Sequence, residues 1–421
     1  MSIHGSARFL SIGITAVMVT AALSACSGSS TSSSGPNSKA SITIGASLSL
    51  NGDFSADGIA FKRGYELWAH DVNAKGGIDG HKVVLIIKND HSSPTQVDAN
   101  YTDLINNSKV DLTFGPFSSL LTAPAGEVAR RYGYAFVEGA GGAPLVFGEK
   151  LPNVFDVSLP VANQLDPFTN WIKSLPASQR PTTAAYPMAN DPFATPQVQR
   201  TQGLLQPLGI KTVYSKIFPE EVPDYLPNGD LVASSKAQAV VLGSTDVPTV
   251  AAFMRAFEQQ HYNPKIFIAA AGPDQGAAFA TAVGSKNTEG MMVPNAWYPG
   301  YDSAASKAMV SEYVSIYGGS PSDVNADVAE AYSVGQVVEQ AIKATGGVQD
   351  AKTMNSKIIS YLHSGVTLTS VQGPVKFDSI GENIKALAFV FQWQNGQYVQ
   401  VLPVGATGSQ KIIYPKPNWS S

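Results

Sequence analysis

Short apolar runs alternate with amphipathic stretches along most of this chain, and this alternation constrains the fold more than any other feature. Lys82–Lys88 has the length of a buried strand, whereas Phe54–Asn73 and Val247–Tyr262 have the length of helices. Strands that alternate with helices form parallel sheets covered by helices. The alternation begins at Ser41 and restarts after Pro160, so it predicts two successive α/β units.

The last third of the chain departs from this rhythm. Three helical stretches are predicted there, over Ser303–Tyr317, Val324–Ala344 and Ala351–Leu362. Two alternating segments then flank Asn395-Gly396, a pair that favours a tight turn between antiparallel strands. The chain should therefore end in a β-hairpin over 386–402. A length of 421 residues also exceeds what one hydrophobic core usually serves, which favours two domains.

The first 25 residues have the features of a secretory signal rather than of a folded segment. Arg8 precedes a short apolar stretch, Phe9–Ala22, which is too short to span a bilayer. The following Leu-Ser-Ala-Cys resembles a bacterial lipobox, which implies that Cys26 is the lipid attachment site; an incidental cysteine beside an ordinary cleavage site is the alternative. Residues 26–40 are then a lipidated cysteine and a flexible tether rich in Ser and Gly.

Several classes of chemistry find no support in the sequence. The formal net charge is −4 and no basic run occurs, which argues against nucleic acid as a partner. The six histidines show no metal-ligand spacing, and neither a Gly-x-Ser-x-Gly elbow nor a Walker loop is present. Cys26 is the only cysteine, so no disulfide can form within the chain. We expect no enzyme activity, no metal and no cofactor.

Several loop motifs together resemble those of a known family. They are Ala74–Gly80 (Ala-Lys-Gly-Gly-Ile-Asp-Gly), Gly115–Ser119, Asp191–Ala194, Ala271–Asp274 and Gly373–Asp378 (Gly-Pro-Val-Lys-Phe-Asp). By these motifs the mature chain resembles the type I periplasmic binding proteins of the branched-chain amino acid and amide group, which are substrate-binding subunits of ABC transporters. The first and last of these motifs are the most specific, and the likeness extends over essentially the whole mature chain.

The resemblance implies a fold of two doubly wound, Rossmann-like α/β lobes joined by a three-strand hinge, as in a Venus flytrap. The chain crossings are expected near Val157–Pro160, Val293–Ala296 and Val371–Gly373. The expected N-terminal lobe comprises 41–158 and 296–371, and the expected C-terminal lobe comprises 159–295 and 372–421. Open α/β sheets bind ligands at the carboxyl ends of their strands, so the site is expected between the lobes.

Nine residues are predicted to contact the ligand, on loops at these strand ends. They are Phe54, Ser118, Ser119, Ala140, Gly141, Gly142, Phe193, Thr245 and Asp274. Ser119 is favoured over Ser118 for a ligand contact, with helix capping as the alternative for either serine. The resemblance implies that Asp274 pairs with a ligand amino group; a helix cap is its alternative. A tight turn is the alternative for the glycine loop, and a core position is the alternative for Phe193.

Two positions depart from the amino-acid binders of this family. Gly142 stands where a threonine usually helps to hold the ligand carboxylate, and Phe193 stands where a tyrosine commonly closes over the ligand. These departures shift the expected ligand from a plain amino acid towards an apolar carboxylate or an amide.

The function implied is that of a monomeric, lipid-anchored solute-binding protein on the extracytoplasmic face of the cell membrane. It would capture a small-molecule solute (a branched-chain amino acid, an amide or an apolar carboxylate) and deliver it to ABC transporter permease subunits. A ligand-sensing lipoprotein that presents its bound state to a signalling receptor is the alternative function, and a lipoprotein enzyme is a third.

Overall fold

The computed structural model describes residues 39–220, 222–406 and 408–419. The predicted signal peptide, Cys26 and all but the last two residues of the predicted tether lie outside these ranges. Within them, no helix is both long and apolar enough to cross a membrane.

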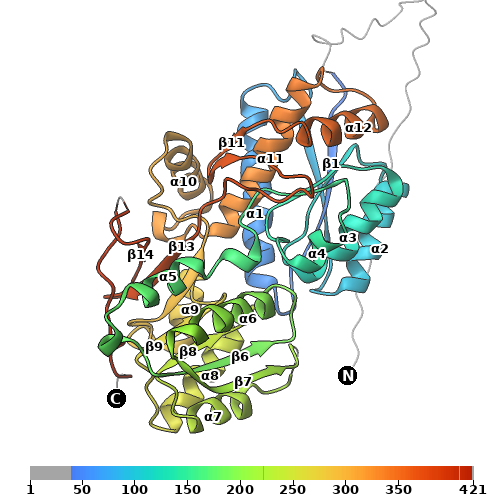
Figure 1. The fold of residues 1–421 in the computed structure, drawn as a ribbon. Coiled ribbons are helices and arrows are strands. Elements are labelled where there is room, and N and C mark those ends of the chain that lie inside the picture. The colour runs from blue at the N-terminus through green and yellow to red at the C-terminus, as the bar shows by residue number, and fades with distance from the viewer. Residues whose placement is uncertain (1–38, 221, 407, 420–421) are drawn as a thin grey trace, which may run out of the picture. The chain divides into compact units, whose positions relative to one another are not determined.

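The first lobe, which is the upper part of the molecule in Figure 1, is built on a five-stranded parallel sheet. The strand order is β2-β1-β3-β4-β5. Its strands are β1 (Ile42–Leu48), β2 (Val83–Asn89), β3 (Leu112–Phe114), β4 (Phe136–Glu138) and β5 (Val154–Asp156). The intervening helices are α1 (Ser55–Ala74), α2 (Pro94–Asn106), α3 (Ser119–Tyr132) and α4 (Pro144–Gly148). The later helices α10 (Ala304–Tyr317), α11 (Ala326–Ala344) and α12 (Ala351–Leu362) return to the same lobe, where their apolar residues share one core with β1 and α1.

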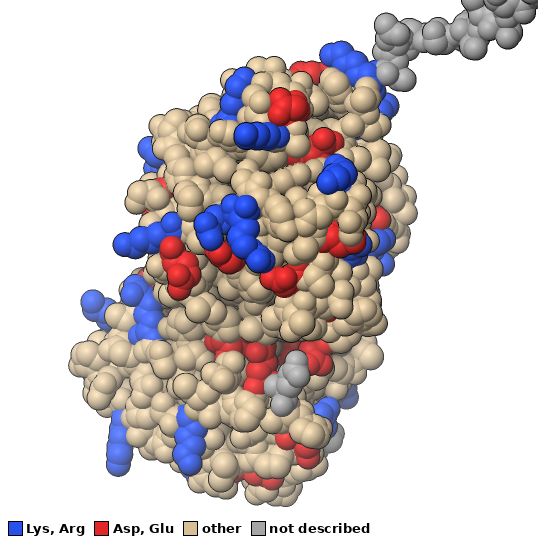
Figure 2. Space-filling model, turned by 90° about the vertical axis from the view of Figure 1, so that its right-hand side faces the viewer, with Lys and Arg blue, Asp and Glu red and all other residues tan. Residues whose placement is uncertain are grey.

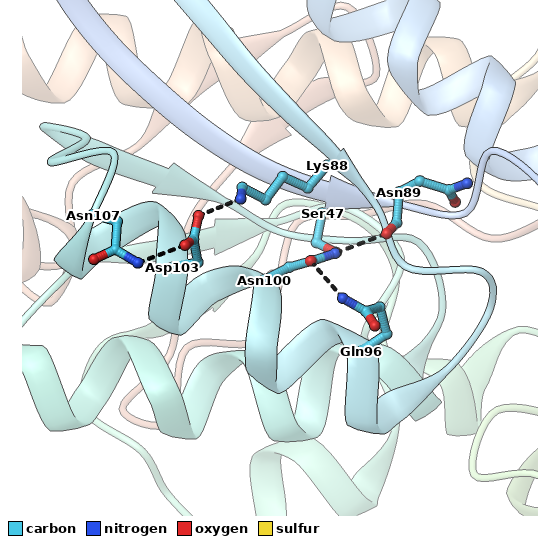
Figure 3. Close-up of polar contacts among 7 residues, drawn as sticks. All are labelled: Ser47, Lys88, Asn89, Gln96, Asn100, Asp103 and Asn107. Atoms are coloured by element: carbon cyan, nitrogen blue, oxygen red, sulfur yellow. Dashed lines mark hydrogen bonds and ion pairs between the residues drawn. The ribbon is translucent and has the colours of Figure 1, made fainter.

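Polar contacts fix the end of β1 against α2 (Figure 3). Asn100 Nδ2 donates hydrogen bonds to Ser47 Oγ at 2.9 Å and to the Asn89 carbonyl at 3.0 Å. Gln96 Nε2 donates to Asn100 Oδ1 at 2.9 Å. These contacts satisfy buried polar groups where β1 and β2 end, so the loop from β1 to α1 leaves the sheet from a fixed point.

The second lobe is built on a seven-stranded sheet in the order β14-β13-β10-β9-β8-β6-β7. Its parallel strands are β6 (Thr183–Ala189), β7 (Lys211–Phe218), β8 (Ala239–Leu242), β9 (Ile266–Ala269) and β10 (Met292–Asn295). Its helices are α5 (Asp166–Ser174), α6 (Ala194–Leu205), α7 (Leu226–Ser234), α8 (Val247–Gln259) and α9 (Gly276–Val283). Short 3-10 turns occur at Val161–Asn163, Ala177–Gln179, Gln206–Leu208 and Pro321–Asp323.

The predicted C-terminal hairpin is confirmed and forms the edge of this second sheet. β13 (Phe389–Gln394) pairs antiparallel with both β10 and β14 (Gln397–Leu402). Asn395 and Gly396 both have positive φ, 53° and 73°, as a tight turn of this type requires.

Two helices in the first lobe approach each other unusually closely. A Cβ added to Gly64 of α1 would lie 2.5 Å from the Val328 carbonyl oxygen of α11. A Cβ added to Gly335 of α11 would lie 2.1 Å from Trp68 Cδ2 of α1. Glycine at both positions therefore permits the α1–α11 packing, which carries the N-terminal end of α11 to the space between the two sheets.

The third expected chain crossing differs from the packing that the structure shows. The hairpin of β11 (Leu368–Ser370) and β12 (Gly373–Val375) belongs to the first core, and so does Phe377, whose ring lies 5.2 Å from that of Phe155. Asn383 Nδ2 then donates to the Val157 carbonyl at 2.8 Å. The division of the chain into lobes stays a proposal, and these contacts favour a third crossing after Asn383 rather than near 371–373.

Candidate functional site

A cavity lies where the carboxyl ends of the strands of both sheets face each other. It contains about 690 Å³ of empty space, part of which is open to solvent. Its first-lobe wall comes from the segments that follow β1, β3, β4 and β5 and from α11. Its second-lobe wall comes from the segments that follow β6, β8 and β9 and from the last residues of β10. The cavity thus has the position expected for a ligand site in open α/β sheets.

Seven of the nine predicted contact residues line this cavity, from both lobes. They are Phe54, Ser118, Ala140, Gly142, Phe193, Thr245 and Asp274. The structure therefore brings together loops that are up to 220 residues apart in the sequence, from Phe54 to Asp274. Ser119 and Gly141 are not among the lining residues. The ligand-binding role of all nine stays a prediction.

Ser118, which precedes α3, and Ser119, the first residue of α3, differ in placement, and the sequence favoured the one that does not line the cavity. Ser118 lines the cavity and also caps α3, because its Oγ accepts a hydrogen bond from Leu121 N at 3.4 Å. Ser119 is fully buried in the first turn of α3, and its Oγ has no hydrogen-bond partner among the described residues. Capping and a position on the cavity wall therefore coincide at Ser118.

The glycine-rich loop after β4 is held by the protein itself. Glu138 Oε2 accepts hydrogen bonds from the backbone N–H groups of Ala140 and Gly141, at 2.8 and 2.5 Å. A Cβ on Gly142 would lie 2.4 Å from Asp156 Oδ2, and one on Gly141 would lie 2.5 Å from Thr122 Cγ2. The glycines thus permit close approach of the protein's own groups, and two of the N–H groups in this loop are already occupied.

Aromatic side chains form the apolar part of the wall. Phe54 is buried, and its ring packs edge-on against that of Phe117 at 5.8 Å. Phe193 stands at the start of α6 on the opposite lobe, partly exposed. Phe193 lines the cavity and also packs against the core of the second lobe, and its backbone N–H donates to Asp191 Oδ1 at 2.7 Å.

Five of the cavity-lining residues that were not among the predicted contacts are carboxylic acids. Besides Asp274, the cavity is lined by Asp57, Asp156, Asp191, Asp327 and Glu330, and no Lys, Arg or His side chain is among the described residues that line it. Asp57, Asp156, Asp191 and Asp327 are buried. On the face shown in Figure 2, acidic side chains also gather in the band between the upper and lower parts of the molecule. Only the Asp327–Glu330 spacing of one helical turn could have hinted at such a cluster.

Burial and mutual repulsion raise the pKa values of these acids. Burial raises the pKa of Asp274 to about 6, and a hydrogen bond from Gly272 N partly opposes this shift. Burial raises the pKa of Asp156 to about 7, and burial together with the charge of Asp274 raises that of Asp327 to about 7. The pKa values of Asp57 and Glu330 are raised well above their usual range, first by burial and then by neighbouring carboxylates.

A side-chain network joins the two lobes at one end of the cavity. Gln275, just before α9, donates through Nε2 to Asp327 Oδ2 at 3.0 Å and also to Asp57 Oδ1. Asn325 Nδ2 donates to Gln275 Oε1 and to Asp327 Oδ2, at 3.0 and 2.9 Å. Asp274 does not cap α9, which begins at Gly276 with no side-chain cap; its Oδ1 accepts from Gly272 N at 2.8 Å. The capping alternative for Asp274 is therefore not observed.

Comparison with known proteins gives a consistent picture. The family model described as periplasmic binding protein matches residues 41–397. The Leu/Ile/Val-binding protein homolog 7 of Brucella suis is 23% identical over 384 residues, which cover 88% of this chain and 94% of that protein.

Solved structures of similar fold carry different ligands. The branched-chain amino acid transporter substrate-binding protein LivJ of Streptococcus pneumoniae, in complex with isoleucine, has a TM-score of 0.72 at 18% identity, covering 86% of this chain and 99% of that one. An ABC transporter solute-binding protein of R. palustris in complex with benzoate has a TM-score of 0.73 at 17% identity, covering 90% and 98%. These likenesses confirm the expected two-lobed α/β architecture.

Proposed function

This chain belongs to the periplasmic binding protein family, and we propose that it captures a small organic solute between its lobes and delivers it to an ABC importer. The observation that carries the proposal is the cavity whose walls come from both lobes. Relatives and structural neighbours are ligand-binding transport proteins, which supports a non-enzymatic role at the level of the family.

The two-lobed cavity gives the proposal its mechanism. A solute that touches Ser118 and Phe54 on one lobe and Asp274 on the other makes all its contacts only when the lobes are together. Binding then shifts the population towards this closed arrangement, because the solute has a higher affinity for it. The closed form is the one that would dock on the permease subunits, and ATP hydrolysis would occur in separate subunits.

Attachment to the membrane completes the proposal. Family membership makes the protein extracytoplasmic, and diacylation at Cys26 would keep it beside the importer as a monomer on a tether. No observation among the described residues favours the sensing alternative, so we do not propose it.

The proposal is tested by small-angle X-ray scattering of the purified chain, combined with thermal unfolding in the presence of pooled small-molecule metabolites. Binding should lower the radius of gyration and raise the thermal midpoint; a solute at about 100 times its Kd adds about 2.7 kcal/mol. Asp274→Ala should lose both responses, whereas Glu149→Gln, at an exposed position away from the cavity, should keep them. A bound solute that leaves the scattering profile unchanged would contradict capture by closure.

A further inference from the structure

The charge of the cavity wall restricts the chemistry of the solute. Six carboxyl groups line the cavity, from both lobes, with no basic side chain among the described lining residues to balance them. A solute whose only charge is negative would lie among these groups with no side-chain cation opposite it. A neutral solute would leave the buried carboxyl groups protonated or unpaired, which is costly in either case.

One of these carboxyl groups, that of Asp156, has a buried oxygen with no hydrogen-bond partner in the described part of the chain. Asp156 is fully buried, and its Oδ1 accepts a hydrogen bond from Ser158 N at 2.7 Å. Its Oδ2 has no hydrogen-bond partner among the described residues, although Asp156 lines the cavity. Buried polar atoms in folded proteins are nearly always paired. A donor brought by the solute would satisfy this oxygen.

The acids are spread along the cavity rather than focused on one point. Asp327 and Glu330 lie one turn apart on α11 and both line the cavity, with a rise of about 4.5 Å between them along the helix axis. Asp57 is joined to Asp327 through Gln275 at one end. Towards the other end, Glu330 and Asp156 both lie against the glycine loop after β4: a Cβ added to Gly139 would lie 3.2 Å from Glu330 Cβ, and one added to Gly142 would lie 2.4 Å from Asp156 Oδ2.

This spread is unlike a metal site. Among the described residues, the one group with three or more metal-ligating side chains close together is His70, Asp71 and Glu312, which does not line the cavity. The cavity acids therefore suit an extended ligand better than a single metal ion.

We infer that the solute is a small organic dication whose two protonated nitrogen groups lie at opposite ends of this row of acids. One group pairs with Asp57, Asp274 and Asp327, and the other pairs with Glu330 and Asp156, while the carbon chain between them packs against Phe54 and Phe193. This inference rests on the proposed capture of a solute in the cavity and names the class of that solute.

The test is isothermal titration of the purified full-length chain at about pH 8, where the acids with pKa near 7 are largely ionised. The probes are the diamines putrescine and cadaverine, the monoamine butylamine, isoleucine and benzoate. At least one diamine should bind about tenfold or more tightly than butylamine. Tighter binding of isoleucine or benzoate would overturn the inference but leave the proposed capture standing, and failure of both diamines to bind would also overturn the inference. If none of the pooled metabolites in the thermal-unfolding experiment binds, the proposed function itself is contradicted.

A set of variants assigns the two ends. In Glu330→Gln, diamine affinity should fall towards that of butylamine, and by a larger factor than butylamine affinity does, because only one end of the row then holds a protonated nitrogen. Asp156→Asn should also lower diamine affinity, and it replaces Glu330→Gln in the test if that variant fails to fold. Glu149→Gln, which removes an exposed carboxylate outside the cavity, should change neither affinity. Equal loss for both amines in Glu330→Gln and Asp156→Asn would contradict the two-ended arrangement.

Discussion

Gln275 and Asp327 are joined by a hydrogen bond of 3.0 Å from Gln275 Nε2 to Asp327 Oδ2, across the space between the two lobes. Gln275 precedes α9 in the second lobe, whereas Asp327 lies in the first turn of α11, whose residues belong to the core of the first lobe. The same amide group donates to Asp57. One side chain thus connects the second lobe to two acids of the first.

Removal of this connection should loosen the contact between the lobes. In Gln275→Ala, Asp57 and Asp327 both lose a hydrogen-bond donor, and a typical hydrogen bond contributes about 0.5–1.5 kcal/mol. We expect a larger radius of gyration in the ligand-free protein and a lower free energy of unfolding in urea. Gln259→Ala, at an exposed position at the end of α8, is the matched control and should change neither quantity.

The stability of the ligand-free protein should fall as pH rises. The folded-state pKa values of Asp274, about 6, and of Asp327 and Asp156, about 7, exceed those of the unfolded chain. Between about pH 4 and 7 the folded state therefore binds more protons than the unfolded chain does. As the pH rises through that window, each of these groups lowers the free energy of unfolding by on the order of 1 kcal/mol per pH unit.

Thermal midpoints measured from about pH 5 to pH 8 at constant ionic strength check this dependence. Asp327→Asn should flatten the profile, because the amide does not titrate, whereas Glu149→Gln should leave its slope unaltered. A midpoint that rises steadily over this range would show that these acids are not protonated in the folded state.

A methyl group at position 142 should disturb the glycine loop. In Gly142→Ala the new Cβ would lie 2.4 Å from Asp156 Oδ2 and 3.0 Å from the Leu159 carbonyl oxygen. Forced overlap of this kind costs about 1–3 kcal/mol, which equilibrium unfolding measures. Gly148→Ala is the control, since a Cβ there meets nothing within 4 Å; an equal loss in both variants would mean that crowding at Asp156 is not the cause.

The proposed lipid anchor makes a separate prediction. Cys26→Ser removes the only thiol in the chain, so the protein should move from the membrane fraction to the soluble fraction and lose the mass of the acyl chains. Fractionation and intact-mass spectrometry check this outcome, with Ser27→Ala as a control that keeps the thiol. Membrane retention of the serine variant would point to a different attachment.

The regular elements followed closely from local sequence pattern. The strand over 82–88 was predicted to within one residue at each end, the helix over 351–362 was predicted with both its ends, and the turn at Asn395-Gly396 was placed correctly. These features depend on periodicity and on the backbone preferences of a few residues. β5 was not predicted as a strand, because three buried residues at a chain crossing carry no periodic pattern.

The site was predictable only in part, and for a related reason. Loops at strand ends can be identified along the chain, and so Ser118, Phe193 and Asp274 were found. Asp327 and Glu330 belong to a late helix, where their spacing of one turn is the one local hint of a site.

By itself, the sequence determined two βα units, a closing hairpin and the strand-end loops, because helix and strand periods are local properties of the chain. Only the tertiary structure decided that α11 packs on α1 through Gly64 and Gly335 and so brings Asp327 beside Asp57, from 270 residues away. The charge of the cavity therefore became visible only in the folded molecule, since it is a sum over acids that no single stretch of sequence contains.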